Sequence, residues 1–419
     1  MRVVSVRGSR PTHGHALPHA RFQQTNFGFS ALTTSTPGRA LRACHSIADL
    51  RTLAQRRLPK VMFDYIDGGA EDEVTLQRNQ ADFCRYQLVP RVLTDVSHIS
   101  LKRRIQGIDS SLPLILSPTG GNRLFHPAGE RAVVPVAERE GLIYSLSSMA
   151  THDIETVAGL GRGPKWFQIY VWKDRGVVRE FIARCKASGY HALILTVDVQ
   201  TFGYRERDLR NGFTLPPRFT AASLLDLALH PAWWWNVLTQ PTITLANVAG
   251  KAGVGVQSAT ALSQYTASQL DTRVTFDDLA WMIEAWGGPF LVKGIANAAD
   301  ARRVTELGAS GVMLSNHGGR QLDHAISPLR ALPDVVAALE GRADIIVDGG
   351  IRRGSDIVKA LCLGATACSV GRPYLYGLAA GGEPGVERAV HLLKSELLRA
   401  MTLLGCDDVA KLDRHFLAH

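Results

Sequence analysis

The segment GVMLSNHGGRQLD, residues 311–323, joins a short apolar run to a polar turn that is rich in glycine. Eight such runs follow one another along the chain, and helix-patterned stretches such as NAADARRVTELGA lie between them. Short β-rich runs that alternate with helical patterns are typical of parallel βα units. We therefore expect strands at residues 112–117, 143–147, 166–170, 192–197, 290–293, 311–315, 345–348 and 367–371.

The number of strands predicts the form of the sheet. Eight parallel strands favour a closed (β/α)8 or TIM barrel, of the α/β class, over an open doubly wound sheet. In such a barrel the carboxyl ends of all strands meet at one face, where active sites are built. Nearly every expected strand ends in a polar residue or a glycine-rich turn, so we expect these residues to converge on one site.

One long interruption breaks the alternation after the fourth strand. Residues 212–273 form an insertion loop with few charges that contains Trp233, Trp234 and Trp235. A loop of this length in a compact domain is usually functional or disordered. Because tryptophan favours the headgroup level of a bilayer, the segment predicts a peripheral membrane contact, or else a barrel lid or an oligomer contact. The lack of Lys or Arg beside the tryptophans weighs against the membrane.

The composition predicts a globular enzyme rather than a membrane-spanning protein. At 46% hydrophobic, the 419 residues can bury a sizeable core. The six cysteines form no close pair, which predicts free thiols in a reducing, cytoplasmic compartment. No apolar run reaches the roughly 18 residues that span a bilayer, so contact with the inner membrane would be peripheral.

The net charge of +9 is unevenly placed. Residues 1–43 hold six arginines and no Asp or Glu, and they are rich in Ser, Thr, His, Pro and Gly without helical periodicity. We expect a disordered basic extension over 1–43, which could also be a targeting peptide, and one folded domain over 44–419. The remaining chain is only mildly basic, so no nucleic-acid partner is expected.

The last two expected strands carry the segments DGGIRRGSD and GRPYLYG. The loops after strands seven and eight are the recurrent phosphate site of this barrel, where glycine lets backbone N–H groups approach an anion and arginine adds charge. Tight turns with surface arginines are the alternative. Without a G-x-G-x-x-G or Walker sequence, a mononucleotide is favoured over a dinucleotide. The candidate phosphate residues are Gly349, Gly350, Arg352, Gly371 and Arg372.

A second group of strand-end residues predicts the reaction. Lys293 supplies a cation that could stabilise negative charge on a cofactor, or else a Schiff base. His317 could accept a proton, with Asp198 to steady the imidazolium. Arg205 and Arg320 would bind a carboxylate. A carboxylate clamp beside a base is what the oxidation of a 2-hydroxy acid needs.

The chain from about residue 47 resembles the family of FMN-dependent 2-hydroxy acid dehydrogenases and oxidases. Ten motifs in order carry the resemblance: DYIDGGAEDEVT from Asp64, SPTG from Ser117, LSS from Leu146, QIY from Gln168, LTVD from Leu195, GYRERD from Gly203, LVKG from Leu291, SNHGGRQLD from Ser315, DGGIRRGSD from Asp348 and GRPYLYG from Gly371.

The resemblance implies FMN as cofactor and a role for each matching residue. Tyr65 and Tyr170 would hydrogen-bond the substrate, Arg205 and Arg320 would hold its carboxylate, His317 would be the base and Asp198 its partner. Lys293 would stabilise the reduced flavin. The other residues expected around FMN are Pro118, Thr119, Gly120, Ser147, Gln168, Thr196, Ser315, Asp348, Gly350, Arg352, Gly371 and Arg372. A tetramer is common in the family.

Two positions depart from the glycolate oxidases of this family. Met149 stands where those enzymes place tryptophan, and Gly120 replaces alanine, as in the mandelate dehydrogenase pattern. We expect the missing methyl group to leave room for a larger substrate. The favoured function is a mandelate- or lactate-like dehydrogenase that passes electrons to a quinone or another carrier. An oxygen-using oxidase that makes hydrogen peroxide is the alternative, and a barrel that only binds a phosphate ligand is an alternative of another class.

Overall fold

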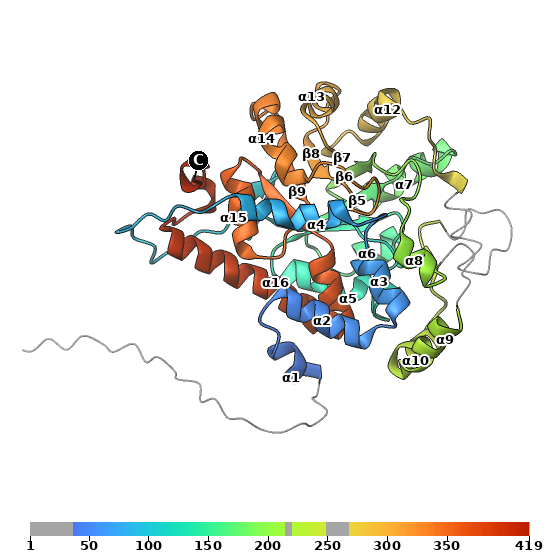
Figure 1. Cartoon of the computed structure of the whole chain (residues 1–419). Coiled ribbons are helices and arrows are strands. Elements are labelled where there is room, and N and C mark those ends of the chain that lie inside the picture. The colour runs from blue at the N-terminus through green and yellow to red at the C-terminus, as the bar shows by residue number, and fades with distance from the viewer. Residues whose placement is uncertain (1–36, 214–219, 249–267, 419) are drawn as a thin grey trace, which may run out of the picture. The chain divides into compact units, whose positions relative to one another are not determined.

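Eight parallel strands form a closed barrel in the computed structural model, which describes residues 37–213, 220–248 and 268–418 (Figure 1). Each strand pairs with its neighbours along the chain, and the last strand closes on the first. The strands are β3 (Leu114–Leu116), β4 (Ile143–Ser147), β5 (Lys165–Ile169), β6 (Ala192–Thr196), β7 (Phe290–Ile295), β8 (Gly311–Ser315), β9 (Asp344–Asp348) and β10 (Ala367–Val370). The predicted (β/α)8 fold is confirmed.

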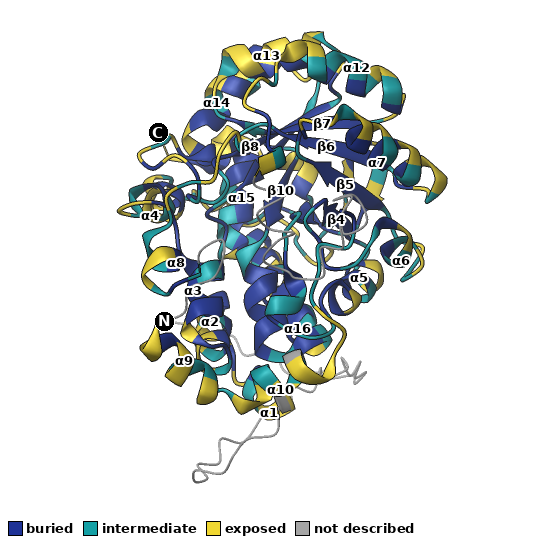
Figure 2. Ribbon diagram, turned by 90° about the vertical axis from the view of Figure 1, so that its right-hand side faces the viewer, coloured by how far each residue is buried: buried dark blue, intermediate teal, exposed yellow. Residues whose placement is uncertain are grey.

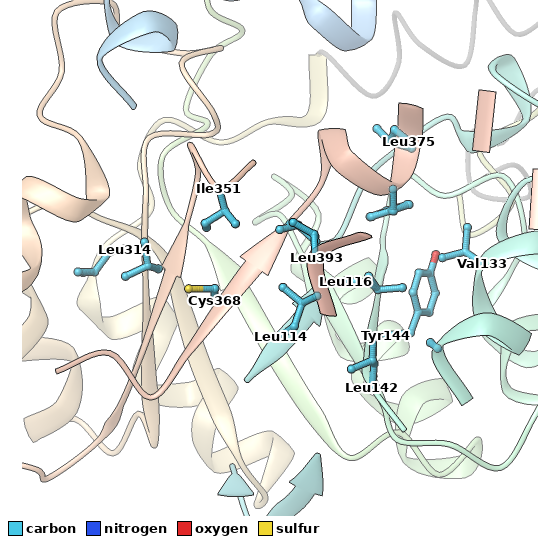
Figure 3. Close-up of a cluster of buried hydrophobic side chains, with 14 of the residues drawn as sticks. Leu114, Leu116, Val133, Leu142, Tyr144, Leu314, Ile351, Cys368, Leu375 and Leu393 are labelled. Atoms are coloured by element: carbon cyan, nitrogen blue, oxygen red, sulfur yellow. The ribbon is translucent and has the colours of Figure 1, made fainter. Parts of the chain in front are cut away.

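Side chains on both faces of the strands are buried. Alternate residues point into the barrel and outward toward the helices, and both spaces are packed. Ile115 of β3 lies in a cluster inside the barrel with Trp166 and Met313 from other strands. Its neighbours Leu114 and Leu116 belong to the larger core between the strands and the helices. Figure 3 shows these outward-facing leucines among buried side chains of the surrounding elements. The core therefore holds the strand ends, and the residues attached to them, in fixed positions.

An outer layer of helices covers the strands. Most of the helices follow a barrel strand: α5 (Glu130–Arg139), α6 (Ile154–Ala158), α7 (Arg175–Ala187), α12 (Phe276–Trp286), α13 (Ala298–Glu306), α14 (Pro328–Leu339), α15 (Gly354–Cys362) and α16 (Arg372–Leu404). Short 3-10 turns lie at η1 (Asp82–Arg85), η2 (Asn122–Leu124), η3 (Val409–Lys411) and η4 (Arg414–Phe416).

A hairpin that the sequence did not predict closes the amino-terminal end of the barrel. Its strands β1 (Arg103–Ile105) and β2 (Ile108–Ser110) pair antiparallel around a turn in which Gln106 and Gly107 have φ of 48° and 78°. Two left-handed residues in a two-residue turn match the twist of a hairpin. Ile105 is fully buried in the cluster inside the barrel, so the hairpin acts as its floor.

Four helices precede the barrel, and they begin earlier than expected. These are α1 (Pro37–Arg42), α2 (Ile47–Arg57), α3 (Lys60–Asp67) and α4 (Val74–Ala81). Leu41 of α1 is only 5% exposed and belongs to the main core. The expected boundary of the disordered extension at residue 43 is therefore too late, because apolar packing already includes α1. The rest of that extension, residues 1–36, lies outside the described residues.

The insertion after β6 contains helices where a loop was expected. α8 (Glu206–Arg210) precedes it, and α9 (Ala221–Ala228) and α10 (Pro231–Thr239) lie within it, whereas residues 214–219 and 249–267 lie outside the described part. The indole Nε1 of Trp233 donates to the carbonyl oxygen of Leu124 at 2.8 Å, which ties α10 to the loop after β3. Trp235 is 61% exposed. Among the described helices, none combines the length and apolar character needed to cross a bilayer.

Candidate active site

A cavity of about 680 Å³ lies at the carboxyl ends of the barrel strands and brings together most of the predicted site residues. Those that line it are Tyr65, Pro118, Thr119, Gly120, Tyr170, Arg205, Lys293, His317, Arg320, Asp348, Gly349, Gly350, Arg352, Gly371 and Arg372. The other predicted residues lie behind this lining, at or near the ends of the same strands: Ser147, Gln168, Thr196, Asp198 and Ser315.

The turn after β8 holds His317 in an unusual backbone conformation. His317 has a φ of 58°, and Gly318 and Gly319 continue the left-handed turn at 66° and 75°. A left-handed conformation costs energy for a residue with a side chain and persists only where its surroundings enforce it. Here Asn316 accepts from the backbone N–H of Gly319 at 3.0 Å and exchanges two hydrogen bonds with Asn79 of α4.

Asp198 lies beside the imidazole of His317. Nδ1 of His317 is 3.1 Å from Oδ1 of Asp198, which leaves Nε2 as the nitrogen without this partner. Burial lowers the pKa of His317 below its ordinary value, although the charge of Asp198 opposes the shift. Burial would raise the pKa of Asp198, but the charges of His317 and Lys293 outweigh it and lower that pKa. The pair therefore consists of a neutral imidazole and an ionised carboxylate at neutral pH.

A glycine makes room for Asp198. Gly294 has a φ of 104°, and a Cβ there would lie 2.8 Å from Cβ of Asp198. The strand is irregular at the same point, between Lys293 and Ile295. The LVKG motif thus needs its glycine for the close approach of β6 to β7.

Two guanidinium groups share the mouth of the cavity with Tyr65. The guanidinium carbon of Arg320 lies 4.8 Å from the centre of the Tyr65 ring, and that of Arg205 lies 5.8 Å from it. Burial and the like charge of Arg205 lower the pKa of Arg320. Two cations this close in a partly closed cavity favour an anion between them.

Asp208 of α8 accompanies this pair of arginines and was not predicted as a site residue. Its Oδ2 lies 3.7 Å from Nη1 of Arg205, and its side chain is buried. Burial raises the pKa of Asp208, against the opposing charges of Arg320 and Arg205. The residue belongs to the GYRERD motif, which was the available signal in the sequence.

Lys293 lies in a buried polar network at the ends of four strands. Its Nζ is 2.8 Å from Oγ of Ser315 and 3.1 Å from Oδ2 of Asp348. Burial would lower the pKa of Lys293, but Asp348 and Asp198 outweigh it and raise that pKa. A Schiff base needs a neutral amine, so the ion pair argues against that alternative. Ser117, which was not named as a site residue, donates to the other oxygen of Asp348 at 2.7 Å.

Two buried polar atoms near the ends of β5 and β6 lack a partner among the described residues. They are Nε2 of Gln168 and Oγ1 of Thr196. Ser147 donates to Oε1 of Gln168 at 2.8 Å, so the amide is fixed with its nitrogen unpaired. Buried polar atoms are normally hydrogen-bonded, and unpaired ones next to a cavity indicate a ligand that completes them. The polar edge of a flavin ring fits this need.

The phosphate end holds a buried arginine at the start of α16. Arg372 donates three hydrogen bonds of 2.8 Å, to the carbonyl oxygens of Ile66, Gly68 and Gly318. A guanidinium has five N–H groups, so two remain for an anion, which the helix N-terminus also favours. Burial lowers the pKa of Arg372 to about 10, as expected for a cation that lacks an anionic partner. Together with Gln168, Thr196 and Lys293, these groups fit FMN.

Two of the predicted glycines are required by the local structure as well. Gly350 has a φ of 84°, and a Cβ there would lie 1.9 Å from the carbonyl oxygen of Asn79, so both its conformation and its packing against α4 require glycine. Gly349 has a φ of 131°, which favours glycine for conformational reasons. Arg352 lines the cavity and donates within its own turn, to the carbonyl oxygen of Ile351 at 2.8 Å.

The expected space beside Gly120 is taken by another residue. A Cβ at Gly120 would lie 2.9 Å from Cβ of Met149 and 3.1 Å from its carbonyl oxygen. The expectation that the missing methyl group leaves room for substrate is therefore wrong, because Met149 fills that volume. The cavity also has an apolar wall that the sequence did not identify as a unit: Leu124, Phe125, Phe202, Phe213, Leu245 and Leu270.

Comparisons with known proteins agree with this geometry. Residues 54–419 match a family described as FMN-dependent dehydrogenase. The chain is 43% identical over 376 residues to L-lactate oxidase of Nostoc sp., covering 89% of this chain and 97% of the relative. It is 40% identical over 372 residues to (S)-mandelate dehydrogenase of Pseudomonas putida, covering 89% and 93%. A crystal structure described as the monotopic membrane protein (S)-mandelate dehydrogenase has a TM-score of 0.86 at 40% identity and covers 90% of this chain and 99% of its own.

Proposed function

This chain belongs to the family of FMN-dependent dehydrogenases, and on that basis we propose that it oxidises an L-2-hydroxy acid to the 2-oxo acid in the cavity around His317. The observation that carries the proposal is the arrangement of one base, His317, and two cations, Arg205 and Arg320, around the same space. A 2-hydroxy acid carries a carboxylate and, on the adjacent carbon, the C–H hydrogen and the O–H proton that are both removed when the acid is oxidised.

Arg205 and Arg320 bind the substrate carboxylate in this proposal. Burial and mutual repulsion raise the free energy of the two guanidinium groups in the empty site. An anion between them is therefore stabilised more than it would be beside an exposed arginine. Tyr65 lies under both guanidinium groups and, with Tyr170, supplies hydroxyl groups to orient the substrate. The carboxylate is thereby fixed while the reacting carbon faces the base.

His317 accepts a proton from the substrate through Nε2. The lowered pKa keeps the imidazole neutral, and Asp198 on Nδ1 stabilises the imidazolium that forms. FMN, when bound, accepts the two electrons that the substrate loses. Lys293, held by Asp348, places a fixed positive charge at the strand ends where negative charge then develops.

We propose a mandelate- or lactate-like substrate whose side chain lies against the apolar wall of Leu124, Phe125, Phe202, Phe213, Leu245 and Leu270. Aromatic and aliphatic lining favours an apolar substituent over the hydrogen of glycolate, because the transfer of apolar surface out of water stabilises binding.

We propose a quinone or another carrier as the electron acceptor, reached through peripheral membrane contact of the 212–273 segment. The support is the exposed Trp235 on α10, beside leucines that are also exposed, and the monotopic (S)-mandelate dehydrogenase with the same fold. An oxidase that makes hydrogen peroxide is the second candidate, and the identity with an L-lactate oxidase favours it.

The test is anaerobic mixing of the FMN-loaded protein with L-lactate, L-mandelate or glycolate, followed by exposure to air or to a quinone analogue. We expect L-mandelate or L-lactate to bleach the flavin faster than glycolate, and the quinone analogue to restore the colour faster than air. Fast recovery in air would establish the oxidase. A protein that is colourless and does not take up FMN would contradict the proposal.

A further inference from the structure

A second cavity lies outside the active site, at the base of α10. It measures about 480 Å³ and lies between the C-terminal end of α2, the turn at residues 123–127 and α10. Its charged and titratable lining is entirely basic: Arg56, Arg57, Arg123, His126 and His230. No Asp or Glu is among the described residues that line it.

The arginines of this basic cavity meet no carboxylate within ion-pair distance in the part of the chain that the structure describes. The guanidinium of Arg57 donates to the carbonyl oxygen of Ala380, and that of Arg123 donates to the carbonyl oxygens of Pro241 and Thr242. Burial lowers the pKa of both groups. Partly buried cations that are satisfied only by carbonyl groups remain available to an anion.

Two carboxylates lie near the basic cavity, and both have other partners. Glu130 raises the pKa of Arg123 less than burial lowers it, and its oxygens accept from Thr151 and His152. Asp226 accepts from the backbone N–H of Lys60 and lies 3.8 Å from Nδ1 of His230. Three arginines line the cavity against these two nearby carboxylates, so a net positive charge remains.

Exposed apolar side chains lie on the two helices next to the basic cavity. Leu229, which lines the cavity, is 70% exposed, and Leu225, Trp235 and Leu238 on α9 and α10 are 64%, 61% and 71% exposed. Figure 2 shows these two helices at the edge of the described structure, with much of their surface exposed. A group of large exposed apolar side chains marks an interaction surface. Apolar side chains beside a cationic recess match a bilayer, which presents acyl chains next to phosphate groups.

We propose that the basic cavity binds the phosphate of an anionic phospholipid while the exposed side chains of α9 and α10 enter the surface of the same bilayer. The inference rests on the proposed membrane contact, but not on the proposed reaction. Arginine suits this ligand because its N–H groups pair with phosphate oxygens in a bidentate manner. A soluble phosphate compound would leave the exposed apolar side chains of α9 and α10 without a function.

The test compares vesicle binding of the FMN-loaded full chain and two doubly substituted forms. Arg56→Gln/Arg123→Gln removes two charges from the basic cavity. Arg302→Gln/Arg399→Gln is the matched control, because both residues are exposed and lie on α13 and near the C-terminal end of α16, away from α9 and α10. Binding is measured by co-sedimentation with phosphatidylcholine vesicles that contain or lack phosphatidylglycerol.

We expect the wild-type protein to prefer vesicles with phosphatidylglycerol, and the cavity variant to bind them about 30-fold more weakly, the loss expected for two arginines at a charged bilayer surface. The control variant should bind like the wild type. Because Arg123 also holds the chain at residue 241, the single variant Arg56→Gln should show a smaller loss with an unchanged fold.

Equal binding by the wild type and the cavity variant would overturn the proposal, as would equal binding to both kinds of vesicle. Displacement from vesicles by millimolar inorganic phosphate, at constant ionic strength, would identify a site for free phosphate instead. Flavin reduction by substrate is measured on the same samples. A protein that binds vesicles but is not reduced would contradict the proposed reaction and leave this inference standing.

Discussion

Nδ1 of His317 lies 3.1 Å from Oδ1 of Asp198, and this contact joins the ends of two barrel strands that are distant in sequence. The left-handed turn at His317 and the glycine at 294 are both needed for it. The contact determines which nitrogen of the imidazole can act as the base. Nδ1 faces Asp198 and cannot also accept a proton from the substrate, so Nε2 is the nitrogen that can.

Substitution of Asp198 tests that assignment through pH. Below the lowered pKa of His317 the imidazole is protonated and cannot accept a proton, so kcat/KM of the wild type should rise with pH and level off above that pKa. Asp198→Asn removes a charge that raises the pKa of His317, so the rising limb should move to lower pH. The plateau of kcat should fall on the order of 100-fold, since the imidazolium loses its partner. A limb that moves to higher pH would contradict the assigned pair.

The effect of Arg205 and Arg320 on turnover should depend on the carboxylate of the substrate, whereas the effect of a charge at the protein surface would not. Arg205→Met removes one charge-assisted contact to the carboxylate, which is worth about 1.5–3 kcal/mol and lowers kcat/KM by about 10- to 150-fold. Steady-state kinetics with a 2-hydroxy acid and with its amide separates the effects. The amide lacks the carboxylate, so the substitution should change its turnover little. An equal loss with both compounds would show that Arg205 does not bind the carboxylate.

The ion pair between Lys293 and Asp348 should contribute to the stability of the folded protein. Lys293→Met leaves the buried Asp348 carboxylate without its cation, and such a change costs about 3–5 kcal/mol of unfolding free energy. In Lys293→Met/Asp348→Asn both charges are absent, so much of that loss should be recovered. Urea unfolding followed by circular dichroism measures both values. A double variant that is less stable than the single variant would contradict the pairing.

Two of the three tryptophans of the insertion should differ in their contribution to stability. Trp233→Phe removes the 2.8 Å hydrogen bond to Leu124 and should destabilise the insertion by about 1 kcal/mol. Trp235→Phe is the matched control, since that residue is 61% exposed and its loss should change stability by less than about 0.5 kcal/mol. The rate of limited proteolysis within residues 214–267 measures the difference. Equal rates for the two variants would contradict this prediction.

The barrel was predictable from local sequence patterns. Short β-branched and aliphatic runs between helical patterns are visible without knowledge of distant contacts, and β4 and β8 have the predicted bounds. The β1–β2 hairpin was missed because its strands are three residues long and partly charged, and only the barrel that it closes explains its burial. The helices α9 and α10 were missed because their apolar, nearly uncharged sequences lack the polar face that marks a surface helix.

The positions of the candidate site residues were predictable where those residues end strands, and the residues that support them from elsewhere were not predictable. Asn79 and Asn316 exchange hydrogen bonds of 2.8 and 2.7 Å, although α4 and β8 lie far apart in the chain. No local pattern indicates such a pair. The requirement for glycine at position 350 likewise depends on the approach of Asn79, and the filled space beside Gly120 depends on the position of Met149.

The central claim is that His317 is the base in an FMN-dependent oxidation of an L-2-hydroxy acid. Anaerobic stopped-flow absorbance of the FMN-loaded wild type and of His317→Gln tests it most directly. The wild type should lose its yellow colour with the L-enantiomer but not with the D-enantiomer. His317→Gln should bind FMN equally well and be reduced at least 100-fold more slowly, the low end of the effect of a general base. Reduction of His317→Gln at the wild-type rate would contradict the claim.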